Sequence, residues 1–342
     1  MKARVWMAVV TIAALISAPL SHAADDKIGI FETILESSQS FSETTTALET
    51  ALADSSLNLH GSHVVRVPDG KQQAKIYVLT APDYAAAAAN ESARTISAQI
   101  LRIAVYTQGD AQTTFVNMAN PVAHAMVFYA NSDSYDAMIA AARTVADELR
   151  NVVGALPGKA LGQQQEPMRR EKHYRKFKGD GPARMMAKFR TYQKSQLLID
   201  SAQADQFEAT IEAVAASLSA DNVGDADDPV GWETVASVRL RDDAVYIGVT
   251  NPYIEDKMIR INSRFRGDAK SDSAPYPGVD HVSALPTDVL IVKEGGQTKV
   301  LHYGQMWRMQ LYFWDSGYRA FTANVGVPSK IANSIEAAVS KR

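Results

Sequence analysis

The sequence reads Gln112-Thr-Thr-Phe-Val116 and then His124-Ala-Met-Val-Phe-Tyr129, and 185 positions later it reads Gln297-Thr-Lys-Val-Leu301 and then Met309-Gln-Leu-Tyr-Phe-Trp314. Each pair is followed by a helical pattern. Similarity at one fixed spacing indicates an internal duplication. We therefore predict two tandem copies of one domain, aligned here without a gap.

Local patterns predict the same order of elements in both halves: a strand, a helix, several antiparallel strands and a closing helix. Ser40-Phe-Ser-Glu43 has the pattern of a capping box at a helix start. The first closing helix, which ends at Gly154, has apolar residues at helical spacing: Ile139, Ala142, Ala146, Leu149 and Val153. We expect first-half strands at 27–35, 63–67, 75–79, 100–106, 113–118 and 123–129, and a helix over 84–96. We expect second-half strands at 186–193, 235–240, 244–250, 289–293, 299–303 and 310–314, and helices from 205 and after Pro328. This order predicts an α+β fold in which each copy has two layers, an antiparallel sheet and its helices.

The N-terminus has the pattern of a secretory signal peptide. Lys2 and Arg4 precede an apolar run over 5–16 and a small-x-small cleavage site, Ser21-His-Ala23. An uncleaved membrane anchor is the alternative, but it needs a longer apolar run. We expect a protein that is periplasmic or secreted after cleavage. Its parts are a signal peptide (1–23), a first repeat (24–154), a basic linker (155–184) and a second repeat (185–342).

The composition excludes several classes of site. The chain has no cysteine, which excludes disulfides, thiolate metal sites and a cysteine nucleophile. Its 35 Lys and Arg against 38 Asp and Glu argue against a nucleic-acid partner. The sequence shows no nucleophile elbow, phosphate loop, dinucleotide fingerprint or zinc-hydrolase spacing, which lowers the expectation of a common enzyme class.

Two motifs carry a family resemblance. The strands end in Thr80-Ala-Pro82 and Thr250-Asn-Pro252, and a later hairpin carries Leu285-Pro-Thr-Asp-Val-Leu-Ile-Val292. In these features each half resembles the bacterial domain-of-unknown-function family 302. The first half departs from the pattern at Ala81, where the family has asparagine, and it lacks Leu-Pro before Arg102. The resemblance implies a fold similar to the repeats of the TATA-box-binding protein, and it implies no established activity.

The ligand-binding residues that we expect lie in the second half. A strand end would hold Asn251 and Pro252, and His281 would approach them. The densest aromatic cluster surrounds Met306-Trp-Arg-Met309, so Trp307 and Arg308 would line a ligand groove or bury against the other half.

Three histidines suggest a metal site. His60-Gly-Ser-His63 places two imidazoles three positions apart, and His124 is a possible third ligand. Solvated loop histidines, and an interior strand position for His124, are the alternatives.

The segment from Arg169 to Lys194 is strongly basic. Its aromatic residues interleave with the charges, a pattern that suits an anionic membrane surface or an acidic partner. A solvated connector is the alternative. The residues expected to make this contact are Arg169, Arg170, Lys172, Arg175, Lys176 and Lys178.

Together these patterns predict an exported, non-catalytic binding or accessory protein, with a site for a small ligand or a periplasmic protein partner between the two repeats. The alternatives are a periplasmic enzyme of unknown reaction that uses Asn251 and His281, and a protein that binds a metal or redox cofactor through its histidines. The sequence names no cofactor.

Overall fold

The computed structural model describes residues 27–68, 71–176, 196–219, 223–265 and 278–340. The predicted signal peptide, Lys178 and the strand predicted over 186–193 lie outside these residues. Within them, no helix has the length and apolar character that a bilayer crossing needs.

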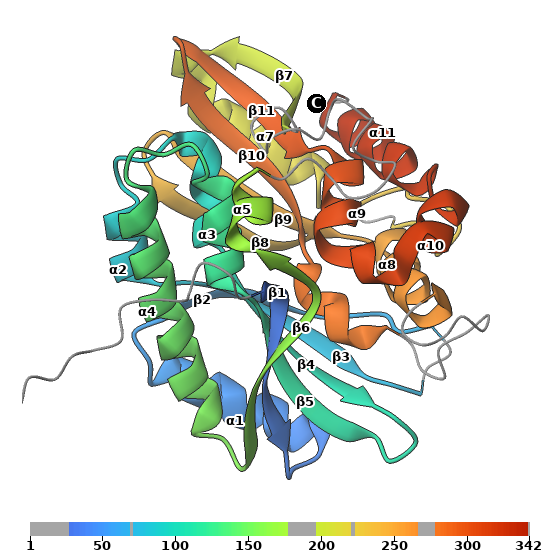
Figure 1. Cartoon of the computed structure of the whole chain (residues 1–342). Helices are drawn as coiled ribbons and strands as arrows, with labels where there is room; N and C mark the ends of the chain where they lie inside the picture. Colours follow the sequence, from blue (N-terminus) through green and yellow to red (C-terminus); the bar gives the residue numbers. More distant parts are fainter. Residues whose placement is uncertain (1–26, 69–70, 177–195, 220–222, 266–277, 341–342) are drawn as a thin grey trace, which may run out of the picture.

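Two antiparallel sheets form the framework, the first in the lower part of Figure 1 and the second in the upper part. The first sheet has the order β2-β3-β4-β5-β1-β6. Its strands are β1 (Lys27–Ser37), β2 (Asn58–Val64), β3 (Ala74–Thr80), β4 (Leu101–Gln108), β5 (Thr113–Ala119) and β6 (Gly158–Arg170). The second sheet has the order β7-β11-β10-β9-β8. Its strands are β7 (Gln196–Gln203), β8 (Glu233–Arg241), β9 (Ala244–Thr250), β10 (Thr287–Glu294) and β11 (Gln297–Tyr303). When the second order is reversed, the two sheets correspond apart from β6: β2, β3, β4, β5 and β1 match β8, β9, β10, β11 and β7.

Helices cover the outer face of each sheet. Helices α1 and α4 pack on the first sheet, and α7 and α11 pack on the second. The helices of the first half are α1 (Phe41–Ala53), α2 (Pro82–Ala87), α3 (Pro121–Phe128), α4 (Tyr135–Gly154) and α5 (Glu171–Arg175). Those of the second half are α7 (Phe207–Ser217), α8 (Pro252–Phe265), α9 (Gln305–Phe313), α10 (Gly317–Ala323) and α11 (Val327–Ser340). Short 3-10 helices are η1 (Ala93–Gln99), η4 (Ala204–Gln206), η5 (Val279–Ala284) and η6 (Trp314–Ser316). The α+β fold class is confirmed.

Two predicted helix signals are present in the structure. The Ser40 hydroxyl accepts from the Glu43 amide at 3.3 Å, and the Glu43 carboxylate accepts from the Ser40 amide at 3.0 Å, so the capping box closes at the start of α1. All five apolar residues expected on the inner face of α4 are buried, and α4 ends at Gly154. Both signals are local, which is why the sequence shows them.

Two predicted strands are wrong. Residues 123–129 and 310–314 lie mainly in helices α3 and α9. A short, wholly apolar run has no periodicity that separates a buried strand from a buried helix. A better signal was Asn120-Pro121: the Asn120 side chain caps the Val122 amide, and proline occupies the first turn of α3.

Strand β6 occupies part of the segment predicted as a linker. Residues 158–170 pair with β1 along its free edge. The sequence predicted a connector here because the segment contains glycines, glutamines and Pro167. A polar edge strand, which pairs with one neighbouring strand, has only a weak strand pattern in its sequence.

The alignment of the two sheets also differs from the repeat found in the sequence. Strand β10 begins 186 positions after β4, whereas β11 begins 184 positions after β5. The hairpin loop is 109–112 in the first half and 295–296 in the second, where Gly295 and Gly296 take the positive φ of a two-residue turn. The gap-free spacing of 185 is therefore one residue off in both strand pairs. Because a shift of one residue turns a strand side chain to the opposite face, that spacing aligns inward-facing residues of one half with outward-facing residues of the other.

The two halves pack reciprocally. Helix η1 of the first half lies on β9 and β10, and η5 of the second half lies on β3, β4 and β5. The edge strands β2 and β8 also touch, with Gly61 so close to the Val235 carbonyl that a side chain would collide with it. The apolar side chains of both halves consequently form one continuous core.

Candidate ligand-binding site

An open cleft of about 660 Å³ lies between the two halves. Its walls come from the first half, on β1, β4, β5 and β6, and its floor comes from the second half, on η5 and η6. The lining residues are Thr33, Tyr106, Gln108, Phe115, Leu161, Gln163, Gln164, Gln165, Glu166, Asp280 and Asp315. The volume suits a small molecule.

The aromatic wall follows from strand alternation. Tyr106 and Gln108 are two positions apart on β4, so their side chains share the inner face of the sheet. Phe115 stands opposite Tyr106 on β5, and the two rings stack with centroids 5.8 Å apart at an interplanar angle of 27°. Phe115 is half-buried and presents its ring to the cleft, whereas Tyr106 is 1% exposed and supports that ring.

The floor holds a histidine between two carboxylates. The distance from His281 Nδ1 to Asp280 Oδ1 is 3.3 Å, and from His281 Nε2 to Asp315 Oδ2 it is 3.2 Å. The His281 ring packs edge-on against Phe31 and stacks on Phe313. Both aspartates line the cleft, whereas the imidazole is 1% exposed beneath them.

Asn117 joins the wall to the floor. Its side-chain amide donates to the Gln165 side chain at 3.1 Å and to the Asp280 backbone carbonyl at 2.6 Å. One buried side chain of β5 thus connects β6 with η5, and the shape of the cleft depends on contacts between the halves.

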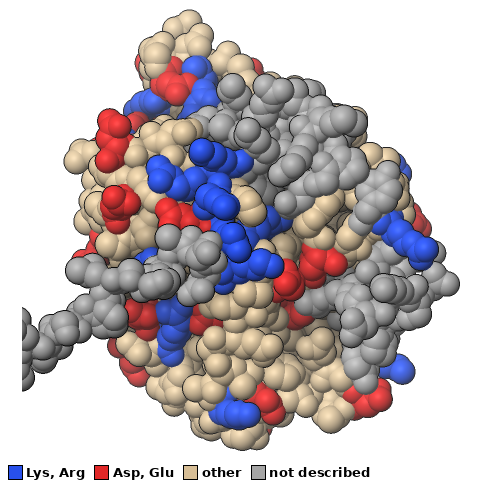
Figure 2. Space-filling view, viewed as in Figure 1, with Lys and Arg blue, Asp and Glu red and all other residues tan. Residues whose placement is uncertain are grey.

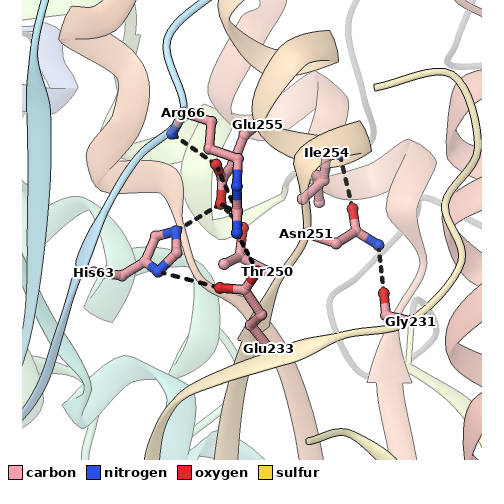
Figure 3. Close-up of polar contacts among 8 residues, drawn as sticks. All are labelled: His63, Arg66, Gly231, Glu233, Thr250, Asn251, Ile254 and Glu255. Carbon is pink, nitrogen blue, oxygen red and sulfur yellow. Dashed lines mark hydrogen bonds and ion pairs between the residues drawn. The ribbon is translucent and has the colours of Figure 1, made fainter. Parts of the chain in front are cut away.

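The predicted ligand residues Asn251 and Pro252 have a local structural role. The Asn251 side chain accepts from the Ile254 amide at 3.0 Å and donates to the Gly231 carbonyl at 3.0 Å, which fixes the first turn of α8 (Figure 3). The Asn251 side chain therefore has a capping role, and a ligand-binding role for it stays a prediction.

Trp307 and Arg308 are buried in the contact between the halves. Trp307 stacks on Tyr303 and meets Phe128 edge-on. Arg308 donates to the Thr287 hydroxyl at 3.1 Å and to the Ala284 carbonyl at the end of η5. Of the two possibilities that the sequence left for this cluster, these contacts favour burial against the other half.

The three histidines predicted as metal ligands have separate partners. His60 Nε2 is 2.7 Å from the Thr80 hydroxyl, His63 Nε2 is 2.7 Å from a Glu255 carboxylate oxygen, and His124 Nε2 is 2.9 Å from the Tyr312 hydroxyl. Burial, together with the charge of Arg102, holds the pKa of His124 well below its usual value. Within the part of the chain that the structure describes, no group of three or more His, Cys, Asp or Glu has the geometry for a metal ion.

A charged cluster around Glu255 was not anticipated from the sequence. Figure 3 shows His63 and Arg66 of the first half pointing at this carboxylate, which is fully buried at the start of α8. Glu255 also accepts from the Arg66 backbone amide at 2.7 Å and from the Thr250 hydroxyl at 2.9 Å, while Arg66 pairs with Glu233 as well. Its oxygens are occupied by protein groups, so the cluster joins the halves and offers no open position to a ligand. Partners nearly two hundred positions apart leave no local signal.

The basic segment is divided between the interior and the surface. Arg169 is 5% exposed, and its guanidinium donates to the Leu311 and Gln310 carbonyls at 3.0 and 2.8 Å, so it is unsuited to a surface contact. Figure 2 shows a group of Lys and Arg side chains near the centre of its face, in the region of α5. The remaining described cations of the segment are the half-buried Arg170 and the exposed Lys172, Arg175 and Lys176. Arg175 also lies 3.9 Å from the centre of the Tyr135 ring.

No family model matches the chain, and no curated protein matches it. A solved structure described as "Crystal structure of uncharacterized conserved protein DUF302 from Bacillus stearothermophilus" is similar over 36% of this chain and 96% of that chain, at 17% identity and a TM-score of 0.31. The family suggested by the sequence motifs thus supplies a structural neighbour at low similarity.

Proposed function

We propose that the chain is an exported, non-catalytic binding protein that holds a small ligand or a segment of a partner protein in the cleft between its halves. The observation that carries this proposal is the cleft of about 660 Å³, whose lining combines aromatic, amide and carboxylate side chains from both halves. Such a mixture of an apolar wall and a few polar groups is typical of ligand sites. Residues 1–23, with the pattern of a signal peptide, support a location outside the cytoplasm.

We also propose that the halves are tandem copies of a domain related to family 302. The corresponding strand orders and the reciprocal positions of η1 and η5 support this proposal. A duplicated domain offers a cleft at its internal junction, and the added strand β6 supplies one wall of that cleft.

Binding is favoured over catalysis by the position of His281. A histidine between two carboxylates suits proton transfer, but a general base must reach the proton that it removes. The His281 ring is 1% exposed and lies below the lining side chains, so it orders Asp280 and Asp315 without meeting the contents of the cleft.

Native mass spectrometry of the protein purified gently from its own host tests the proposal. We expect a stoichiometric additional mass, or a co-purifying partner, that is lost from a Gln163→Trp variant because the indole fills the cleft from exposed strand β6. Lys159→Trp is the matched control, since Lys159 is exposed on the same strand and does not line the cleft. An additional mass retained equally by both variants would refute the cleft as the binding site.

A second role, peripheral contact with an anionic membrane, is favoured by the exposed cations over α5 and the end of β6 (Figure 2). Each basic residue near an anionic surface contributes on the order of 1 kcal/mol, so several together support weak, salt-sensitive attachment. This surface includes the end of β6, the strand that supplies one wall of the cleft.

A further inference from the structure

We propose that the cleft selects a small organic cation, such as a diamine, a polyamine or a quaternary ammonium compound. This inference rests on the proposed binding function and names its ligand class. It is carried by the carboxylates of the floor and rim together with the aromatic and amide walls.

The charge of the lining favours a positive ligand. Three carboxylates line the cleft, Glu166, Asp280 and Asp315, and the lining residues that the structure describes include no lysine or arginine. Even with His281 protonated between the aspartates, one positive charge stands against three negative charges. A negative ligand would meet repulsion here, whereas a cation balances the lining.

Desolvation strengthens this preference. The side chain of Asp280 is 6% exposed, so a ligand seated above it removes its remaining contact with water, whereas both Asp315 carboxylate oxygens are already buried. Removing water from a carboxylate is unfavourable unless a positive or hydrogen-bonding group replaces it. An ammonium group supplies both replacements at once, since it brings charge and N–H donors.

The aromatic wall has the matching electronic character. The face of an aromatic ring carries partial negative charge and attracts cations that lie over it. Phe115, which is half-buried and stacks on the 1% exposed Tyr106, presents such a ring to the cleft. A cation with alkyl or methyl groups gains apolar contact and electrostatic attraction from the same wall.

The glutamines complete the selection. Gln108 and Gln163 line the cleft, and their amide oxygens are acceptors for N–H groups, whereas the Gln165 oxygen already accepts from Asn117. The β6 segment that resembled a connector in sequence thus places amide acceptors along one wall.

Isothermal titration calorimetry of the full mature protein tests the ligand class. The panel is putrescine, spermidine and choline as cations, glucose as a neutral polyol and glutamate as an anion. We expect at least one cation to bind, and we expect glucose and glutamate to show no binding. Asp280→Asn, Asp315→Asn and Glu166→Gln should each weaken the cation at least severalfold, with the largest losses at the two buried aspartates. Phe115→Leu should weaken choline more than putrescine, because the quaternary group relies more on the ring.

Asp110→Asn is the control, because this exposed aspartate lies in the β4–β5 hairpin outside the lining. Near-UV circular dichroism checks that each variant keeps its fold, and Glu166→Gln retains a test if the Asp280 variant does not fold, since Glu166 is exposed. Binding of glucose or glutamate without any cation overturns the ligand class but leaves the binding function intact. Loss of the same size in Asp110→Asn overturns the site, and the absence of binding by any cation in the panel overturns the inference. A native protein with neither an additional mass nor a partner contradicts the proposed function itself.

Discussion

Arg102 of β4 and Asp288 of β10 face each other across the contact between the halves, with Nη2 and Oδ1 3.5 Å apart. Each residue is the second of its strand, and both side chains are buried. Corresponding positions of the two sheets therefore carry opposite charges and meet where the halves join. Arg102 also donates to the Ala284 carbonyl at 3.2 Å, and Asp288 accepts from the Tyr246 hydroxyl at 3.0 Å. We therefore predict that the Arg102–Asp288 pair stabilises the contact between the halves.

Removal of one partner should be strongly destabilising. Arg102→Leu leaves the buried Asp288 with Arg308 as its remaining charged neighbour, so we expect the free energy of unfolding to fall by about 3 kcal/mol. Adding Asp288→Leu should restore only part of that loss, because it also removes the negative charge that favours the buried Arg308. Urea unfolding of the two single variants and the double variant measures the coupling. Strictly additive losses would show that the two charges act independently.

The buried His124 should make the protein sensitive to mild acid. Burial and the nearby Arg102 lower the pKa of His124 in the folded state, so the unfolded state binds a proton more readily. Stability should therefore fall as the pH drops below the unfolded value of about 6.5, by at most about 1.4 kcal/mol per pH unit for this group. His124→Gln should reduce the fall in urea midpoint between pH 7.5 and 5.5.

The comparison between pH 7.5 and 5.5 separates histidines from acidic groups. Arg94 and Lys299 lower the pKa of Glu294 to about 2, so the stability from that ion pair is lost only below the unfolded pKa of about 4.3. His60 and His302 also have lowered pKa values through burial, so a residual acid sensitivity should persist in His124→Gln. An unchanged pH dependence in the variant would contradict the assignment.

The buried Glu255 should matter more than its exposed neighbour. Glu255→Gln weakens charge-assisted contacts with His63 and Arg66, and we expect a loss of about 2 to 3 kcal/mol in unfolding free energy. Glu233→Gln removes a partly exposed partner of the same arginine and should cost less than about 1 kcal/mol. Urea unfolding at low and high salt measures both, and equal losses would argue against burial as the cause.

Asn251 should affect stability and leave ligand binding unchanged. Asn251→Ala removes the cap of α8 and the hydrogen bond to Gly231, with an expected loss of about 2 kcal/mol. Asn251→Ser keeps a capping oxygen and should recover about half of that loss. Thermal unfolding and native mass spectrometry of the retained ligand provide the two readouts. A lost ligand in a folded Asn251→Ala variant would restore this asparagine as a binding residue.

Attachment to anionic vesicles should depend on the cations of α5 and on the half-buried Arg170, and not on Arg169. A variant with Arg170, Lys172, Arg175 and Lys176 changed to glutamine should lose binding to phosphatidylserine-containing vesicles at low salt, because its attraction to the surface is removed. Arg169→Gln should retain the binding but lower stability, since Arg169 holds the carbonyls at the end of α9. Vesicle sedimentation measures this, and a parent protein that never sediments would exclude the membrane role.

The parts of the fold predicted correctly depend on neighbouring residues. The Ser40-to-Glu43 capping box and the inner face of α4 could be predicted from the sequence because each depends on residues within one helix. The segments 123–129 and 310–314 were assigned to strands because all-apolar runs do not reveal their period. The strands over 100–106 and 113–118 were expected, whereas the shorter loop at Gly295 and Gly296 shifted the alignment of the two halves in a way that the repeat could not show.

The cleft was predicted only as a location between the halves. Of its surroundings, the sequence pointed to His281 but not to the flanking Asp280 and Asp315, which become a pair only when η5 and η6 pack together. Gln165 was assigned to a linker because the partner of β6 is a strand more than a hundred positions earlier. The places of these residues around the cleft depend on packing between distant parts of the chain, which no local sequence pattern shows.

The reciprocal placement of η1 and η5 affects how the first half can fold during synthesis. Synthesis proceeds from the N-terminus, so strands β1 to β5 are complete long before η5 exists to cover their inner face. Until Val279–Ala284 pack against the first sheet, its inner face lacks this cover, so a first half on its own would expose the apolar side chains that η5 buries.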